Sequence, residues 1–168
     1  MVATPPPETM DDLILLLRQN ARTSNEDLAK ELNTSAEAVA ARIAALEKDG
    51  LVLGYSAIVD SQRVQSNTVT AAIEVSITPE RGGGFDRLAQ RISKFAEVQS
   101  CYLMSGGYDL LVIVEGPTLQ EVATFISEKL ATIKGVISTA TRFRLKTYKE
   151  NGVALTRESG PERLAVAP

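Results

Sequence analysis

The sequence predicts an α+β protein in which an N-terminal winged helix-turn-helix unit precedes a ferredoxin-like βαββαβ unit. Three observations predict this fold class. Apolar residues recur at the helical spacing of about 3.6 residues up to residue 50, and at the strand spacing of about 2 from residue 68 onward. The 168 residues are 44% apolar and 23% charged, an ordinary globular composition, and the length suits two small domains.

The first two helices are predicted from their capping residues. The first is expected to open at Thr9, with Asp12 three residues later, and the second at Ser24, with Asp27 in the same relation. A hydroxyl residue followed three residues later by an acidic one resembles a capping box, in which side chains satisfy the first backbone N–H groups of a helix. Apolar residues on one side of each segment then supply a face for packing.

The third helix is expected to begin at Thr34 or Ser35 and to end at Gly50, a residue type typical of the position after a helix. Asn33 and Thr34 form the turn before it, which is short enough for a DNA-reading helix-turn-helix motif. Residues 51–60 are expected to be extended and to supply the wing. Three short helices and a strand together predict the winged helix-turn-helix.

The second unit is predicted to alternate strands and helices in the order β-α-β-β-α-β. The last strand is expected to place Ile137, Thr139, Thr141, Phe143 and Leu145 on one face. This order is that of the ferredoxin-like fold. The expected elements are strands over 69–77, 98–104, 110–114 and 137–145, and helices over 85–95 and 119–133.

These patterns divide the chain into five parts. Residues 1–8, with three consecutive prolines, are expected to be a disordered lead-in. The other parts are a DNA-binding head over 9–60, a linker over 61–67, an effector-sensing and oligomerisation domain over 68–146, and a C-terminal tail over 147–168.

Composition excludes several kinds of site. The chain has no histidine, which removes histidine-dependent catalytic arrangements and most transition-metal sites. A single cysteine, Cys101, allows no intramolecular disulfide and favours a reducing compartment. The N-terminus lacks the features of a signal peptide, and no apolar run approaches membrane-spanning length. We therefore expect a cytoplasmic protein that is not an enzyme and has no metal, cofactor or membrane partner.

Several short motifs together resemble a known family. They are Gln19–Arg22, Leu28–Leu32, Val39–Glu47, Gly50–Asp60, Ser105–Asp109 and Leu145–Lys149. In this order and spacing, over about residues 10–153, the chain resembles the leucine-responsive and asparagine-synthase-regulator (Lrp/AsnC) transcription regulators of bacteria and archaea. The resemblance implies a DNA-binding head, a dimerising sheet domain that senses small molecules, often amino acids, and assembly into dimers, tetramers or octamers.

Five residues are candidates for DNA contacts. Ser35, Glu37 and Arg42 belong to the presumed recognition helix, and Arg22 and Lys30 are candidates for phosphate contacts. Residues 10–60 contain nine acidic and five basic residues, a net charge of −4, which is unfavourable for phosphate binding. For Arg42 the alternative is a surface position or an ion pair within the head.

The turn after the second strand is the candidate effector site. Glycines expose backbone N–H groups that can receive a carboxylate, and Asp109 can face an ammonium group. The resemblance implies that this turn lines a cleft between dimers, with Val136, Ser138 and Thr139 supplied from across the interface. The alternative is a purely structural hairpin connection that Asp109 caps. The residues of the turn are Ser105, Gly106, Gly107, Tyr108 and Asp109.

The resulting prediction is a sequence-specific DNA-binding transcription regulator. Its DNA affinity or assembly state would respond to a small effector, an amino acid, and its partners would be double-stranded DNA and further copies of itself. One alternative is a ligand-binding oligomer with little DNA affinity that acts through protein partners. Another is an enzyme resembling the sirohaem decarboxylases, which share this architecture but depend on histidine, and the chain has none.

Overall fold

The computed structural model describes residues 11–60, 63–64, 68–78 and 84–155. The expectations for the lead-in, for Thr9, for most of the linker and for the tail after residue 155 lie outside these residues. The chain divides into two compact units, Met1–Ala57 and Ile58–Pro168.

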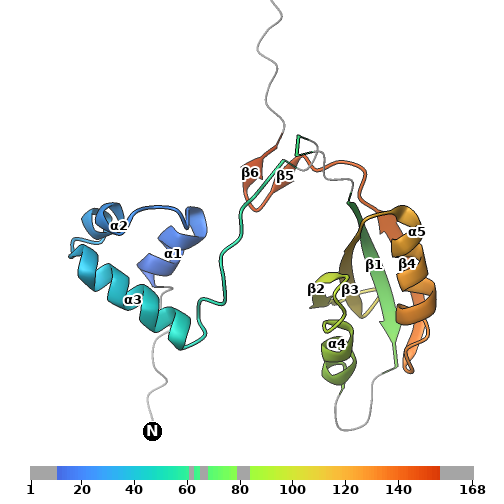
Figure 1. Cartoon of the computed structure of the whole chain (residues 1–168). Helices are drawn as coiled ribbons and strands as arrows, with labels where there is room; N and C mark the ends of the chain where they lie inside the picture. The colour runs from blue at the N-terminus through green and yellow to red at the C-terminus, as the bar shows by residue number, and fades with distance from the viewer. Residues whose placement is uncertain (1–10, 61–62, 65–67, 79–83, 156–168) are drawn as a thin grey trace, which may run out of the picture. The chain divides into compact units, whose positions relative to one another are not determined.

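Three helices form the head (Figure 1). They are α1 (Asp12–Gln19), α2 (Asn25–Glu31) and α3 (Ala36–Lys48). Each helix buries one apolar stripe against the other two, and these stripes hold the helix-turn-helix together. The buried residues are Leu13, Leu17, Leu28, Ala29 and Val39.

The start of α1 differs from the prediction. The helix begins at Asp12, and its N-cap is Asp11 rather than Thr9. The Asp11 carboxylate accepts a hydrogen bond of 2.8 Å from the Leu13 backbone N–H. The helix therefore begins later than predicted, because Asp11, nearer the apolar stripe, satisfies the first backbone donors.

The caps of α2 and α3 agree with the prediction. Ser24 accepts a hydrogen bond of 3.1 Å from the Asp27 N–H, as a helix N-cap does, and its hydroxyl donates one of 2.9 Å to the Asp27 carboxylate. Ser35 accepts a 3.2 Å bond from the Ala38 N–H at the start of α3. Gly50 follows α3 with a positive φ of 70°, the left-handed conformation that glycine adopts readily.

The predicted wing strand is not found as a strand. Residues 53–60 are assigned to no strand in the described part of the chain. Leu53 and Val59 are 92% and 58% exposed, and the Tyr55 hydroxyl donates a 2.9 Å hydrogen bond to Glu47 of α3. A strand needs a neighbouring strand for its backbone groups, and within the described residues this segment has none.

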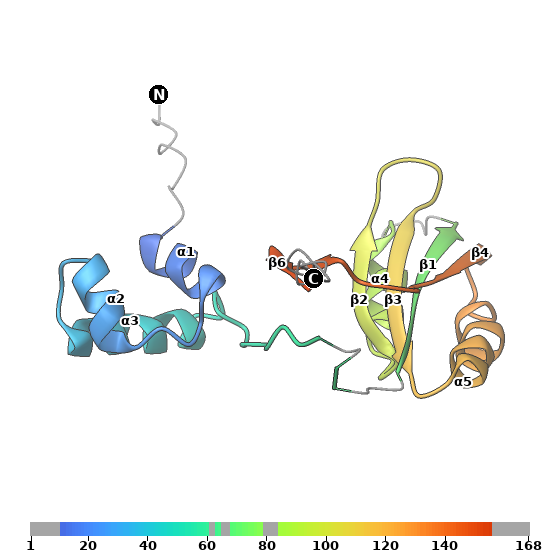
Figure 2. The ribbon, with the colours of Figure 1, turned by 90° about the horizontal axis from the view of Figure 1, so that it is seen from above.

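The second unit is a four-stranded antiparallel sheet with the order β2-β3-β1-β4. Its helices α4 and α5 pack on one face of the sheet (Figure 2). This arrangement confirms the ferredoxin-like βαββαβ prediction. The elements are β1 (Val69–Ile77), α4 (Asp86–Ile92), β2 (Val98–Leu103), β3 (Leu110–Gly116), α5 (Leu119–Thr124) with a π-helical continuation η1 (Phe125–Leu130), and β4 (Val136–Phe143).

The core of this unit lies between the sheet and its helices. The alternating residues Ala71, Ile73, Val75 and Ile77 of β1 are buried there, which confirms the period-2 pattern. The opposite side of the sheet, which we call the open face, is left without a helix in the described structure. Residues of the core cluster on the other elements include Leu88, Ile92, Leu110, Val112, Val114, Val122, Phe125, Leu130 and Ile133.

A register shift changes the predicted face of β4. Ser138 pairs with Ser76, whereas the next β1 residue, Ile77, pairs with Val136. Ile137 is therefore bulged out and is 67% exposed, and Leu145, which lies beyond β4, is 93% exposed. The expected apolar face is wrong at these two positions, because the bulge takes Ile137 out of the alternation and β4 ends at Phe143, before Leu145.

Two further strands follow, which the patterns above do not predict. They are β5 (Lys149–Glu150) and β6 (Val153–Ala154), joined by Asn151 and Gly152. Both turn residues have positive φ angles, 44° and 87°, as a tight hairpin turn of primed type requires.

Candidate DNA-binding and effector sites

The exposed surface of α3 offers few polar side chains. Base edges are read by hydrogen bonds from groups such as arginine, asparagine and glutamine, and alanine can contribute only apolar contacts. Arg42 is the basic residue nearest the middle of this surface. The exposed positions of α3 are Glu37, Ala40, Ala41, Arg42, Ala44, Ala45, Glu47 and Lys48.

Ser35 and Glu37 are engaged with each other and with the start of α3. The Ser35 hydroxyl oxygen accepts the 3.2 Å bond from Ala38. The Glu37 carboxylate accepts a hydrogen bond from the Glu37 backbone N–H and another from the Ser35 side chain. Both bonds lower the pKa of Glu37, and the backbone bond has the larger effect. Both candidates thus serve as local caps, and contact with a base would have to replace these bonds.

Arg42 forms an ion pair inside the head. Its Nη2 lies 2.7 Å from Oδ1 of Asp11, and the two side chains are 46% and 33% exposed. This is the alternative that the sequence left open for Arg42. The pair occupies one edge of a guanidinium group that has five N–H donors, so further contacts remain possible.

The two phosphate candidates differ in their surroundings. Lys30 pairs with Asp27 at 2.7 Å, and its side chain is 75% exposed. Arg22 lies exposed in the turn between α1 and α2, where its backbone N–H donates a 3.0 Å bond to the Asn20 side chain. Neither arrangement buries the cationic group.

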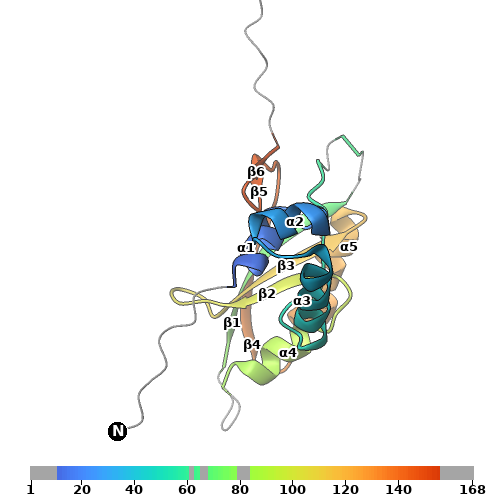
Figure 3. The same cartoon turned by 90° about the vertical axis from the view of Figure 1, so that its left-hand side faces the viewer.

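The candidate effector turn, residues 105–109, projects from the end of the sheet between β2 and β3 (Figures 2 and 3). Ser105, Gly106 and Gly107 are exposed, and Tyr108 and Asp109 are half-buried. Gly106 has a φ of 130°, which favours glycine, and a Cβ added at either glycine would meet no atom within 4 Å. The backbone here therefore faces open space.

Asp109 is fixed to the end of β1. Its Oδ2 accepts a 2.8 Å hydrogen bond from the Ile77 N–H, and its own N–H donates a 3.1 Å bond to the Val75 carbonyl. The Asp109 carbonyl accepts a 2.8 Å bond from Met104 and closes the turn. The carboxylate is therefore held in position by the backbone, and its Oδ1 has no partner in the described part of the chain.

The other three effector candidates flank the same end of β1 from β4. Val136, Ser138 and Thr139 pair with the last three residues of β1, whose Ile77 also binds Asp109. The structure thus places both groups of candidates at one end of the sheet within a single chain. Ser138 points to the open face with its partner Ser76, and Thr139 to the helix side with Val75.

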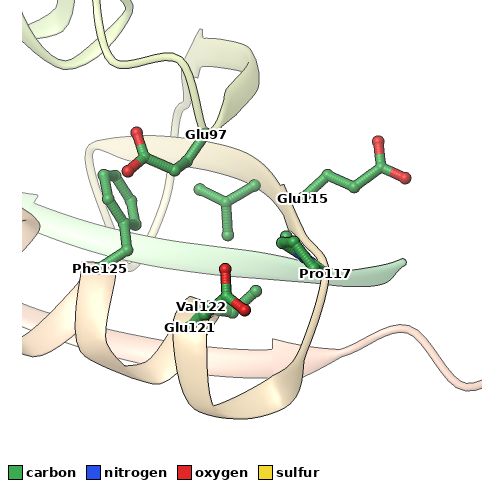
Figure 4. Close-up of a pocket in the computed structure, with 8 residues that line it drawn as sticks. Glu97, Glu115, Pro117, Glu121, Val122 and Phe125 are labelled. Carbon is green, nitrogen blue, oxygen red and sulfur yellow. The ribbon is translucent and has the colours of Figure 1, made fainter. Parts of the chain in front are cut away.

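A separate cavity of about 90 Å³ lies at the opposite end of β3 (Figure 4). None of the residues predicted for DNA or effector binding lines it. Glu97 at its rim pairs with Lys129 at 2.6 Å, which lowers the pKa of Glu97, and Glu121 accepts a hydrogen bond from Thr118 at the start of α5. Structural partners thus explain these two carboxylates.

Among the described residues, no group of three or more His, Cys, Asp or Glu side chains is arranged to hold a metal ion. The same residues include no helix with the length and apolarity needed to cross a bilayer.

Family models match both units. Residues 12–52 match a model described as winged helix-turn-helix DNA-binding, and residues 70–154 match the Lrp/AsnC ligand binding domain. The second match includes the β5–β6 hairpin, which the sequence patterns missed although Asn-Gly is a known turn signal.

Similar proteins support both matches. The chain is 41% identical to the uncharacterized HTH-type transcriptional regulator YugG of Bacillus subtilis (strain 168), over 96% of this chain and 98% of that protein. It is 27% identical to the leucine-responsive regulatory protein of Escherichia coli (strain K12), over 80% and 82% of the two chains. A transcriptional regulator of Neisseria meningitidis, solved as a complex with L-Met, superposes with a TM-score of 0.64 at 26% identity, covering 88% and 97%.

These relatives are transcription regulators by name, and the two family models unite a DNA-binding head with a ligand-binding domain in one chain. The protein is accordingly a DNA-binding transcription regulator that responds to a small effector, and it belongs to the Lrp/AsnC family.

Proposed function

We propose that the effector is a free amino acid and that it binds at the turn 105–109. The observation that carries the proposal is the placement of Asp109 at the end of β1, next to two glycines that face open space. Backbone N–H groups of the turn can donate hydrogen bonds to the carboxylate of an amino acid, and Asp109 Oδ1 can accept a hydrogen bond from its ammonium group. The complex of the Neisseria regulator with L-Met supports this class of ligand.

Val136, Ser138 and Thr139 complete the proposed site. They lie at the same end of the sheet as Asp109, but the family resemblance expects them to come from a neighbouring dimer. Either copy can supply them, since in a closed symmetric assembly the same residues recur at every equivalent interface. Their side chains are small, which leaves room for the side chain of the effector.

We further propose that the protein works in the cytoplasm as a homodimer that assembles into tetramers or octamers. The open face of the sheet supports this, because its apolar side chains have no covering helix in the described structure. At its centre Arg142 Nε donates a 2.9 Å hydrogen bond to Glu74, and this bond lowers the pKa of Glu74. A second copy would cover the face. The apolar residues of the open face include Ala72, Tyr102, Leu111, Ile113 and Ala140.

For DNA we propose that α3 enters the major groove, with Ser35, Glu37 and Arg42 toward the bases and Arg22 and Lys30 on phosphates. Selection of binding sites from random DNA, with and without a panel of amino acids, tests the whole proposal. We expect one enriched motif and an amino acid that changes affinity for it. No enrichment and no salt-dependent binding would instead favour a ligand-binding oligomer that acts through protein partners.

Substitution of Arg42 by alanine is the sharpest single test of the head. We expect DNA binding to weaken by about 1–3 kcal/mol with relaxed preference at one base position if Arg42 contacts a base. A phosphate contact would instead give a uniform loss and a salt slope smaller by about one. Titration at several salt concentrations distinguishes the two.

Lys48→Ala is the matched control, because Lys48 has the same charge and is exposed in the last turn of α3. Equal effects of the two substitutions would show that only overall charge matters, and an unchanged affinity for Arg42→Ala would reject the contact.

A further inference from the structure

Asp11 makes two contacts through one oxygen. Its Oδ1 accepts the 2.8 Å bond from the Leu13 N–H that caps α1 and the 2.7 Å bond from Arg42 Nη2 of α3. Burial raises the pKa of Asp11, but the hydrogen bonds from Arg42 and Leu13 outweigh it, and the net pKa is lowered. The carboxylate is thus charged at neutral pH and is fixed to α1 by the cap.

In this geometry Arg42 cannot bind Asp11 and a phosphate at the same edge of its guanidinium group at the same time. Since the cap holds Asp11 in place, the carboxylate cannot accompany Arg42 toward DNA. The pair is also partly exposed, with side chains 46% and 33% accessible, and ion pairs of this exposure are weak. When the ion pair breaks, Asp11 keeps its hydrogen bond to the Leu13 N–H. A phosphate can therefore replace Asp11 at Arg42 without leaving a buried group unpaired.

We propose that Asp11 is a residue that sets the DNA affinity of the head, by competing with phosphate for Arg42. The inference rests on the proposed role of Arg42 in DNA binding, and takes its contact on DNA of random sequence to be with a phosphate, in place of the base contact proposed for a specific site. Phosphate contacts supply most of the affinity for DNA of any sequence. In the free protein the Asp11 carboxylate is paired with Arg42, and this pairing lowers the affinity for non-specific DNA. At a specific DNA site Arg42 exchanges Asp11 for a group of the DNA and so regains the contact. The head gains selectivity at the expense of strength.

The chain offers a matched pair of variants. Asp11→Asn removes the charge but keeps an oxygen for the Leu13 N–H, because asparagine caps helices about as well as aspartate. Asp12→Asn removes the same charge one residue later, at an exposed position that takes part in none of the ion pairs of the described residues. The difference between them isolates the contact with Arg42 from the effect of net charge.

The experiment measures binding of the full chain to a random-sequence duplex of about 30 base pairs, between about 50 and 200 mM salt. We expect Asp11→Asn to tighten binding about three- to tenfold at the low end and to make the salt slope steeper by about one. Asp12→Asn should produce a smaller gain with an unchanged slope. On an Arg42→Ala background, Asp11→Asn should give no more than Asp12→Asn.

Three outcomes would overturn the inference or its basis. Equal gains for the two asparagine variants, or a gain from Asp11→Asn that persists without Arg42, would show that Asp11 acts only through net charge. An Arg42→Ala variant that binds DNA like the parent would reject the proposed contact itself, and the inference with it. If Asp11→Asn lowers the melting temperature of the head, Asp11→Ser, which keeps a capping hydroxyl, replaces it in the same comparison.

Discussion

Asp109→Asn is expected to weaken amino-acid binding by about 100-fold or more while the fold and the assembly stay intact. Asparagine still offers an oxygen to the Ile77 N–H, which Asp109 now binds at 2.8 Å, so the turn keeps its position. It has no negative charge for the ammonium group of the effector. Breaking one side of a desolvated ion pair costs about 3 kcal/mol or more, which corresponds to this loss.

Asp109→Ala separates the two possible roles of this residue. Alanine removes the acceptor of the Ile77 N–H as well, and an orphaned half-buried donor costs about 1–3 kcal/mol of stability. If Asp109 only caps the hairpin, Asp109→Asn should bind the effector like the parent, and only Asp109→Ala should lose stability. Calorimetric titration with the amino acid, combined with thermal unfolding of each variant, distinguishes these outcomes.

The elements that local signals determine were predicted well. In β1 each alternate residue points to the same side, so four apolar residues in register were enough to predict a half-buried strand. Ser24 and Ser35 cap helices through bonds to residues only three positions away, which a short motif can reveal. The split βαβ order followed from such segments alone.

Contacts between residues distant in the sequence were not predictable in the same way. Asp11 and Arg42 are 31 positions apart, and Asp109 and Ile77 are 32 apart, so no spacing rule points to either bond. The bulge that exposes Ile137 depends on the pairing of β4 with β1, which periodicity within one strand does not contain. The sequence therefore predicted the candidate site residues but not the contacts of Asp11 and Asp109 from which the tests above are designed.

The oligomer proposal leads to a second large effect, at the open face of the sheet. Ile113 lies on this face in β3, opposite Ala72 of β1 and Ser100 of β2. It is only partly buried in the single chain, so an aspartate there can reach water in a monomer. In a dimer packed on this face, the new carboxylate would be buried without a partner, at a cost of several kcal/mol.

Ile113→Asp is therefore expected to convert the assembly into monomers at micromolar concentration, as measured by light scattering after size-exclusion chromatography. Leu119→Asp is the matched control, because Leu119 is 56% exposed at the start of α5, on the covered side of the sheet, and an acidic residue suits the first turn of a helix. This control should keep the mass of the parent. A parent chain that is already monomeric would contradict the proposed oligomer. An oligomer that survives Ile113→Asp with an unchanged circular dichroism spectrum would show that its interface lies outside the open face.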